Sequence, residues 1–86
     1  MAQYSLGLMY DHGYSVTKNF NKAFQWYLRA ANQDVLAQNM VGLMYENGRG
    51  VTQDLNEAFK WFSKAAEQGH IQAKENIERL KPDVQD

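Results

Sequence analysis

The sequence predicts an all-α protein of stacked helical hairpins. The first observation behind this fold class is an internal repeat, because residues 2–36 align with residues 37–71 and 16 of the 35 aligned positions are identical. A period in the mid-thirties is typical of solenoids, in which each unit buries its apolar face against a neighbour. The second observation is that glycines and helix-capping residues recur at equivalent places in both copies. We therefore expect two hairpins and one further helix after them.

The first helix of each copy is expected over about residues 2–12 and 35–47. Gly13 and Gly48 follow these segments directly. Glycine adopts the left-handed conformation at a helix C-terminus without a steric penalty, so the two glycines mark where these helices end.

The second helix of each copy is expected over about residues 20–33 and 55–68. Asn19 and Asp54 precede these segments, and both residue types favour the N-cap position because their side chains accept from free backbone amides. Glu57 stands three residues after Asp54, which completes the pattern of a capping box.

The ends of the later helices carry weaker signals. Gly69 is expected to end the second helix of the second copy, and Asp34 to take the same left-handed position in the first copy. The fifth helix is expected over about residues 71–80, with Pro82 stopping it. Its charged outer residues suit the cap of a solenoid. We therefore treat residues 1–86 as one domain with repeat 1 at 2–36, repeat 2 at 37–72, a capping helix at 73–81 and a tail at 82–86.

A shared set of small and aromatic residues recurs in both copies. The residues of this set are Leu6, Gly7, Tyr10, Gly13, Val16, Ala23, Trp26, Tyr27, Ala30 and Ala31, then Val41, Gly42, Tyr45, Gly48, Arg49, Gly50, Val51, Asp54, Ala58, Trp61, Phe62, Ala65 and Ala66. This pattern resembles the Sel1-like repeat, a relative of the tetratricopeptide repeat with a longer turn inside each hairpin. The resemblance implies a right-handed α/α superhelix. It also implies a scaffold or adaptor role, often in bacterial envelope, secretion or host-interaction pathways.

Two details of the pattern lead to further expectations. The small residues Gly7 and Gly42 should let helices approach closely, with Trp26 and Trp61 supplying buried area opposite them. Ser15 stands where the second copy has Gly50, so the first turn is expected to be stiffer or differently shaped.

Composition excludes several functional classes. The net charge of −1 argues against a nucleic-acid or anionic-membrane surface, where a basic excess is expected. No apolar run approaches the roughly 20 residues that span a bilayer. The chain contains no cysteine, which excludes disulfides and thiolate metal sites. The lack of a visible leader favours the cytoplasm by default, and removal of a leader would allow a periplasmic or secreted location.

No catalytic, metal or cofactor site is predicted. His12 and His70 occupy different places in the repeat and have no second ligand at metal-binding spacing. The segment 48–50 reads Gly-Arg-Gly, but it lacks the lysine and hydroxyl residue of a phosphate-binding loop. A cysteine-rich branch of the Sel1-like family has been linked to β-lactam binding or hydrolysis. This chain lacks those cysteines, so an enzyme is a remote alternative.

The first helix of each repeat presents a candidate binding face. A residue two positions beyond the core face is rotated by about 200°, and so lies on the opposite side of the helix. In tetratricopeptide-like stacks this side is concave, which would place Leu8 and Leu43 in a groove rimmed by Asp11 and Glu46, suited to an apolar and basic peptide. Alternatively, the two leucines pack against the second helices. The candidate binding residues are Tyr4, Leu8, Asp11, Asn39, Leu43, Glu46, Glu75 and Arg79.

The sequence thus predicts a non-catalytic module that binds a protein or peptide, with no nucleic acid and no membrane insertion. A second hypothesis is self-assembly, because about three repeats are usually needed for stability and this chain has two and a cap. A homodimer through uncapped repeat ends, or a place within a longer solenoid, would satisfy that need.

On the last helix, Glu75 and Arg79 are expected to form a surface ion pair at i, i+4.

Overall fold

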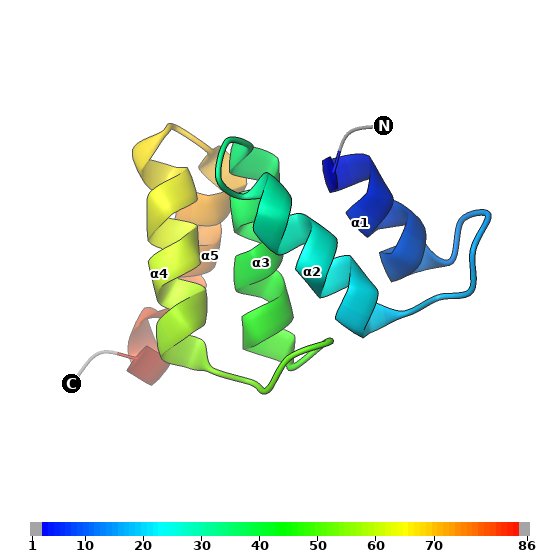
Figure 1. Ribbon diagram of the computed structural model, residues 1–86. Coiled ribbons are helices and arrows are strands. Elements are labelled where there is room, and N and C mark those ends of the chain that lie inside the picture. Colours follow the sequence, from blue (N-terminus) through cyan, green and yellow to red (C-terminus); the bar gives the residue numbers. More distant parts are fainter. Residues whose placement is uncertain (1–2, 85–86) are drawn as a thin grey trace.

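The computed structural model describes residues 3–84, with residues 82–84 described by their backbone only. It forms five α-helices and, within the described residues, no strand, so the all-α repeat fold is confirmed (Figure 1). The expected start at Ala2 and the last two tail residues lie outside the described range. The helices are α1 (Gln3–His12), α2 (Phe20–Ala30), α3 (Val35–Asn47), α4 (Leu55–Glu67) and α5 (Ile71–Val84).

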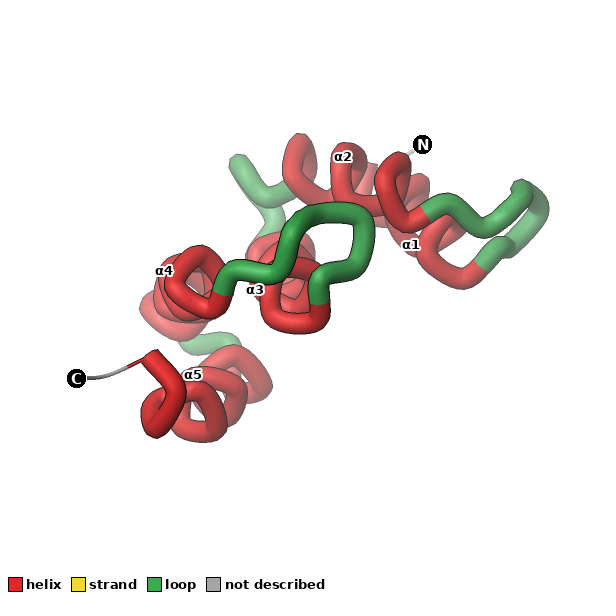
Figure 2. Tube along the Cα trace, turned by 90° about the horizontal axis from the view of Figure 1, so that it is seen from below, coloured by secondary structure: helices red, strands yellow, loops and turns green. Residues whose placement is uncertain are grey.

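The helices form a bent row rather than a ball. Consecutive helices pack against one another along the whole row, from α1 on α2 to α4 on α5. Figure 2 shows α1, α3 and α5 along one side of the row and α2 and α4 along the other. The molecule measures 41 × 24 × 16 Å, and the two ends of the chain lie at its opposite ends (Figure 1).

The predicted helix ends at glycine are confirmed. Gly13 and Gly48 have φ values of 74° and 65°, directly after α1 and α3. Gly69, after α4, has a φ of 89°. These left-handed residues turn the chain so that the last carbonyls of each helix find a donor. For example, the amide of Arg49 donates to the carbonyl of Met44 at 3.0 Å.

The predicted N-caps are also confirmed. Asn19 accepts from the backbone amide of Lys22 at 3.0 Å, and Asp54 accepts from the amide of Glu57 at 3.1 Å. Both cap residues are extended, as the N-cap position requires. The two capped helices therefore begin where the sequence indicates.

Three expected boundaries are wrong, and the first is the end of α2, which lies at Ala30 and not near residue 33. Asp34 does not take a left-handed position: its φ is −116° and it caps α3, accepting from the amide of Leu36 at 2.9 Å. Because α2 already ends at Ala30, Asp34 is free to act as an N-cap, a position that aspartate favours. The last helix does not stop before Pro82 but continues to Val84. Proline lacks one backbone donor, yet its fixed φ is compatible with a helix.

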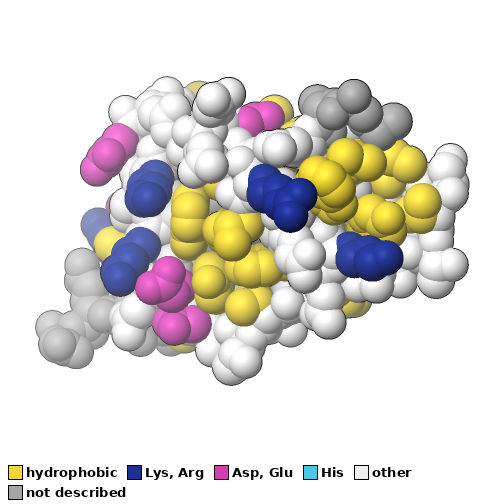
Figure 3. Space-filling view, in the orientation of Figure 1, with side chains coloured by type: hydrophobic (Ala, Val, Ile, Leu, Met, Phe, Trp, Pro, Cys, Tyr) yellow, Lys and Arg dark blue, Asp and Glu magenta, His cyan; other side chains and the backbone are white. Residues whose placement is uncertain are grey.

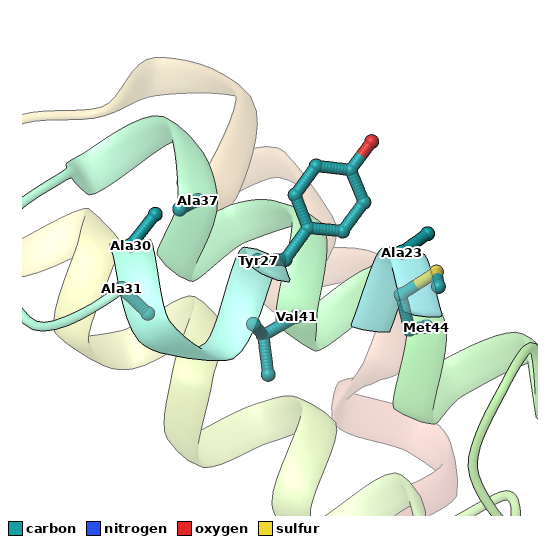
Figure 4. Close-up of a cluster of buried hydrophobic side chains, with 7 residues drawn as sticks. All are labelled: Ala23, Tyr27, Ala30, Ala31, Ala37, Val41 and Met44. Carbon is teal, nitrogen blue, oxygen red and sulfur yellow. The ribbon is translucent and has the colours of Figure 1, made fainter. Parts of the chain in front are cut away.

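The larger core cluster lies between α2 and α3. It contains alanines from both helices together with Tyr27, Val41 and Met44, which are fully buried (Figure 4). A smaller cluster joins α4 to α5 through Ala58, Phe62 and Leu80. The clusters follow the repeat, so each hairpin depends on its neighbour for burial.

The aromatic residues opposite the glycines are Tyr27 and Phe62, not the predicted tryptophans. A Cβ added to Gly7 would lie 2.5 Å from the Tyr27 ring, and one added to Gly42 would lie 2.5 Å from the Phe62 ring. Trp26 is only half-buried, because one residue along a helix is a rotation of about 100°. Each ring therefore packs against a helix backbone at a position that only glycine leaves open.

The turn between α3 and α4 packs against the start of α2. A Cβ added to Gly50 would lie 2.6 Å from the carbonyl carbon of Phe20 and closer still to its oxygen. Ser15, the counterpart in the first turn, has a φ of 63°, close to the 72° of Gly50. The two turns therefore share this backbone conformation, and the expectation of a different shape is wrong. They differ in their surroundings, because Ser15 carries a Cβ that Gly50 has no room for.

Candidate protein-interaction surface

The side of the molecule formed by α1, α3 and α5 carries partly exposed apolar residues. Of the predicted set, Tyr4 and Leu8 pack against the larger core cluster and Leu43 against the smaller one, and all three remain partly exposed. The Tyr4 ring centroid lies 5.7 Å from that of Tyr27. Leu36 stands seven residues before Leu43, on the same helical face, and is 45% exposed. We define the apolar stripe as Tyr4, Leu8, Leu36 and Leu43.

Asp11 does not lie on a rim of this surface. It is 3% exposed, and one carboxylate oxygen accepts from the Tyr27 hydroxyl at 3.0 Å. The Arg49 guanidinium lies 3.9 Å from the same oxygen. The other oxygen of Asp11 and Nε of Arg49 are buried, and within the described residues neither has a hydrogen-bond partner. The predicted acidic rim residue is thus part of a buried contact between the first hairpin and the turn after α3.

The pKa of Tyr27 is raised well above its ordinary value, first by burial and then by the neighbouring Asp11 carboxylate. The folded state therefore keeps the phenol proton at a pH where the unfolded chain has lost it. The stability that the protonated Tyr27 contributes is therefore fully present below about pH 10, the pKa of the unfolded chain. It is lost as the pH rises above that value.

We expect the free energy of unfolding to fall as the pH rises above about 10, and to fall less steeply in Tyr27→Phe. Urea unfolding followed by circular dichroism at a series of pH values measures both slopes. Some slope should remain in the variant, because burial also raises the pKa values of Tyr4 and Tyr45. Equal slopes in the two proteins would contradict the assignment to Tyr27.

A polar seam connects α3 to α5. The Asn76 amide donates to the Asn39 side-chain oxygen at 3.0 Å, and Asn39 in turn donates to Gln72 at 3.5 Å. Arg79 donates to both carboxylate oxygens of Glu46 and, at 2.9 Å, to Asn76. Asn39 and Asn76 are both buried. Three residues of the predicted set, Asn39, Glu46 and Arg79, therefore come together, but they do so to join two helices.

The predicted ion pair between Glu75 and Arg79 does not form, because Arg79 turns to Glu46 on the neighbouring helix. The hydrogen bond to Glu46 raises the pKa of the Arg79 guanidinium, and the nearby charge adds to the effect. Glu75 is exposed. Of the acidic residues in the predicted set, Glu75 is thus the one that faces solvent freely.

Four residues of this region were missed. Gln72, Asn76 and Arg79 recur at helical spacing on α5, so a polar face of this helix was visible in the sequence. Leu36 continues the Leu43 face one heptad earlier, which is also a sequence signal. The contact of Arg49 with Asp11 is different: it joins residues 38 positions apart across two hairpins, and no local pattern announces it.

The described part of the chain offers no group of three or more His, Asp or Glu side chains arranged to hold a metal ion. Among the helices over residues 3–84, none combines the length and the apolar character that a membrane span requires.

Comparison with known proteins places the chain among repeat proteins. The family model described as Sel1 repeat matches residues 1–35 and 35–70. A Sel1 repeat protein from Oxalobacter formigenes superimposes with a TM-score of 0.89 at 45% identity, over 92% of this chain and 33% of that one. A search of curated proteins finds no match.

Two further solved structures are similar. A protective antigen of uropathogenic Escherichia coli strains gives a TM-score of 0.89 at 38% identity, covering 91% of this chain and 17% of the antigen. Cysteine-rich protein B of Helicobacter pylori gives 0.79 at 32% identity, covering 83% of this chain and 54% of that protein. The chain thus spans between about a sixth and about half of these longer relatives. The two consecutive family matches, which cover most of the sequence, show that the chain belongs to the Sel1 repeat family.

Proposed function

We propose that this chain is a non-catalytic interaction module that binds an extended segment of a partner protein along the side formed by α1, α3 and α5. Sel1 repeat proteins generally mediate protein–protein interaction, and the scaffold is generally non-enzymatic. The observation that supports the proposal is the apolar stripe of Tyr4, Leu8, Leu36 and Leu43, whose side chains stay at least partly exposed. The helices that carry it, α1 and α3, lie on the same side of the bent row as α5 (Figure 2). Partly exposed apolar residues in one region are typical of binding surfaces.

The chemistry of the ligand differs from the sequence-based expectation. A preference for basic peptides rested on Asp11 and Glu46, but Asp11 is buried and Glu46 is bound by Arg79. Apolar contact with the stripe should therefore dominate affinity, with the exposed Glu75 contributing orientation. The ligand that suits this side is an apolar segment with a basic group at one flank.

A matched pair of leucines tests the proposal. Leu36 on the stripe is 45% exposed, and Leu28 on α2 is 38% exposed, so neither leucine is needed for the core. Peptides selected from a displayed random library on the immobilised protein would be measured against Leu36→Gln and Leu28→Gln by isothermal titration calorimetry. We expect Leu36→Gln to weaken binding at least about tenfold and Leu28→Gln to leave it unchanged.

The position of the bound peptide is mapped by nuclear magnetic resonance on the labelled protein. Amide shifts should concentrate in α1, α3 and α5, including the residues around Leu8, Leu43 and Glu75. Shifts confined to α2 and α4, or equal losses for the two leucine variants, would reject this side as the binding surface. Leu36 is replaced instead of Leu8 or Leu43, because Leu8 and Leu43 pack against the core clusters, where a polar side chain would also destabilise the fold.

A further inference from the structure

The apolar stripe is divided between the two hairpins. Tyr4 and Leu8 belong to α1 of the first hairpin, and Leu36 and Leu43 belong to α3 of the second. A ligand segment that contacts all four residues has to bridge the hairpins, so its affinity depends on the angle between them. Contacts that fix this angle therefore also govern binding.

Apolar packing brings the hairpins together but gives their angle little direction. Alanines of α2 and the Val41 and Met44 side chains of α3 form one buried cluster (Figure 4). On the face seen in Figure 3, hydrophobic side chains gather between α2 and α4, and Trp61 of α4 packs against the same cluster. Apolar burial is non-directional, and small alanine side chains form shallow ridges, so polar and main-chain contacts have most influence on the angle.

The turn between α3 and α4 supplies such contacts, because it reaches from the second hairpin to the start of α2 (Figure 1). Its backbone at Gly50 lies against the main chain of Phe20, where a Cβ on Gly50 would be 2.6 Å from the carbonyl carbon. Val51 packs against the larger core cluster. This close approach brings the side chain of Arg49 to the place where α1 ends and α2 begins.

Arg49 contacts both helices of the first hairpin. Its guanidinium lies 5.5 Å from the centre of the Phe20 ring, at the start of α2. It also lies 3.9 Å from a carboxylate oxygen of Asp11, near the end of α1. The same oxygen accepts from the Tyr27 hydroxyl, further along α2. We define the hairpin clamp as Arg49 and Gly50 of the second hairpin with Asp11 and Phe20 of the first.

Burial makes the clamp resist rotation. The Asp11 side chain is 1% exposed, whereas that of Arg49 is 36% exposed. If the second hairpin rotated away, the guanidinium would be solvated, but the carboxylate would stay buried without a cation beside it. Such a loss is unfavourable because charges attract one another more strongly where water is excluded. The contact therefore favours one angle between the hairpins.

The next joint of the row has a similar arrangement. Asp11 aligns with Glu46 in the internal repeat, and Glu46 accepts from Arg79 of α5. Both carboxylates stand near the end of the first helix of a hairpin, and each arginine comes from the next unit along the row. In this chain the acidic residue at this repeat position thus joins consecutive units.

We propose, on the basis of the function proposed above, that Arg49 is a positioning residue for the ligand. It fixes the angle between the hairpins and so holds the two halves of the apolar stripe in the arrangement that one extended segment binds. Arg49 acts through this angle and not by touching the ligand. Without its contact the hairpins would sample several angles, and the apparent affinity would fall with the fraction of molecules at the binding angle.

Distances between spin labels test the clamp without a ligand. The chain contains no cysteine, so labels attach only to cysteines introduced for the purpose. The hairpin distance joins Gln25→Cys on α2 to Lys60→Cys on α4, and the control distance joins Lys60→Cys to Lys74→Cys on α5. All three positions are exposed. Double electron–electron resonance measures the distribution of each distance.

We expect Arg49→Gln to broaden or shift the hairpin distance and to leave the control distance unchanged. Asp11→Asn should have the same effect, although its side-chain oxygen still accepts from the Tyr27 hydroxyl. Arg29→Gln is the matched control, because the Arg29 guanidinium lies over the Trp26 ring of its own helix, and it should change neither distance. Circular dichroism confirms that each variant is folded at the temperature of measurement.

The effect on binding is measured by calorimetry with the peptide selected on the native protein and with the half of it that magnetic resonance places on Leu36 and Leu43. We expect Arg49→Gln to weaken the whole peptide about tenfold, as when about a tenth of the molecules keep the binding angle, and the half peptide less than about twofold. Arg29→Gln should affect neither peptide. A loss of overall stability would act on both peptides alike.

Two results would overturn the proposal. One is a hairpin distance that stays the same in Arg49→Gln and in Asp11→Asn, because the contact would then not set the angle. The other is a broadened hairpin distance with unchanged affinity for the whole peptide. Failure of the proposed function looks different, because Leu36→Gln would leave binding unchanged while the hairpin distance still responded to Arg49→Gln. The clamp would then stand, and its role in binding would be rejected.

Discussion

Replacing Gly50 with serine should destabilise the protein by about 2–5 kcal/mol. The left-handed conformation costs a residue with a side chain roughly 1–2 kcal/mol, and overlap of the new Cβ with the Phe20 backbone adds roughly 1–3 kcal/mol. The overlap cannot be relieved by a rotamer change because its partner is main chain. Urea unfolding of the variant, followed by circular dichroism, gives the loss directly.

Two controls separate the cost of conformation from the cost of contact. Gly69 is also left-handed, but a Cβ there would have nothing within 4 Å, so Gly69→Ser should cost only the conformational part, about 1–2 kcal/mol. Ser15→Gly should be neutral or stabilising by up to about 1 kcal/mol, since it relieves the same strain. Equal losses at positions 50 and 69 would show that the turn does not press against α2.

The serine and glycine at these equivalent positions show what an internal repeat does and does not reveal. The repeat period predicted the hairpins. The glycines and the N-cap residues predicted at which residue most helices begin or end. These signals are local, and each acts through the backbone of its own segment. The reason for glycine at position 50 and not at position 15 is a contact between hairpins, which becomes visible only when they are stacked.

The same limit explains the errors around the core. Trp26 was expected against Gly7 because it is the largest residue of its helix, whereas the neighbouring Tyr27 occupies that place. The repeat pattern specifies that an aromatic pair faces the glycine, but two adjacent residues differ by only about 100° around the helix. Which of them is buried depends on how the two helices cross.

The candidate surface stays a prediction, and several of its polar residues were misread. Helical spacing groups Leu8, Leu43 and their neighbours on one side of their helices. It could not show that a buried tyrosine hydroxyl would satisfy Asp11. Nor could it show that the fifth helix would bring Asn76 and Arg79 to α3. Polar residues on a predicted binding face were therefore assigned to a ligand although they bind one another.

Removing the hydroxyl of Tyr27 should destabilise the protein by about 2–4 kcal/mol, far more than the loss of one exposed hydrogen bond. In Tyr27→Phe the Asp11 carboxylate stays buried but loses its donor, and Arg49 at 3.9 Å is too distant to replace it fully. A charged group left without its partner in the interior carries most of its desolvation cost. Thermal and urea unfolding of the variant measure the effect.

The second hairpin supports this reasoning, because it has Phe62 where the first has Tyr27. There the counterpart of Asp11 is Glu46, which lies nearer solvent and is bound by Arg79, so no hydroxyl is needed. The expected result is that Tyr27→Phe combined with Asp11→Leu recovers most of the loss caused by Tyr27→Phe alone. Tyr45→Phe serves as the control and should change stability by less than about 0.5 kcal/mol. If the double variant lost as much unfolding free energy as the two single variants lose together, the two side chains would not be coupled. The buried contact would then contribute packing alone.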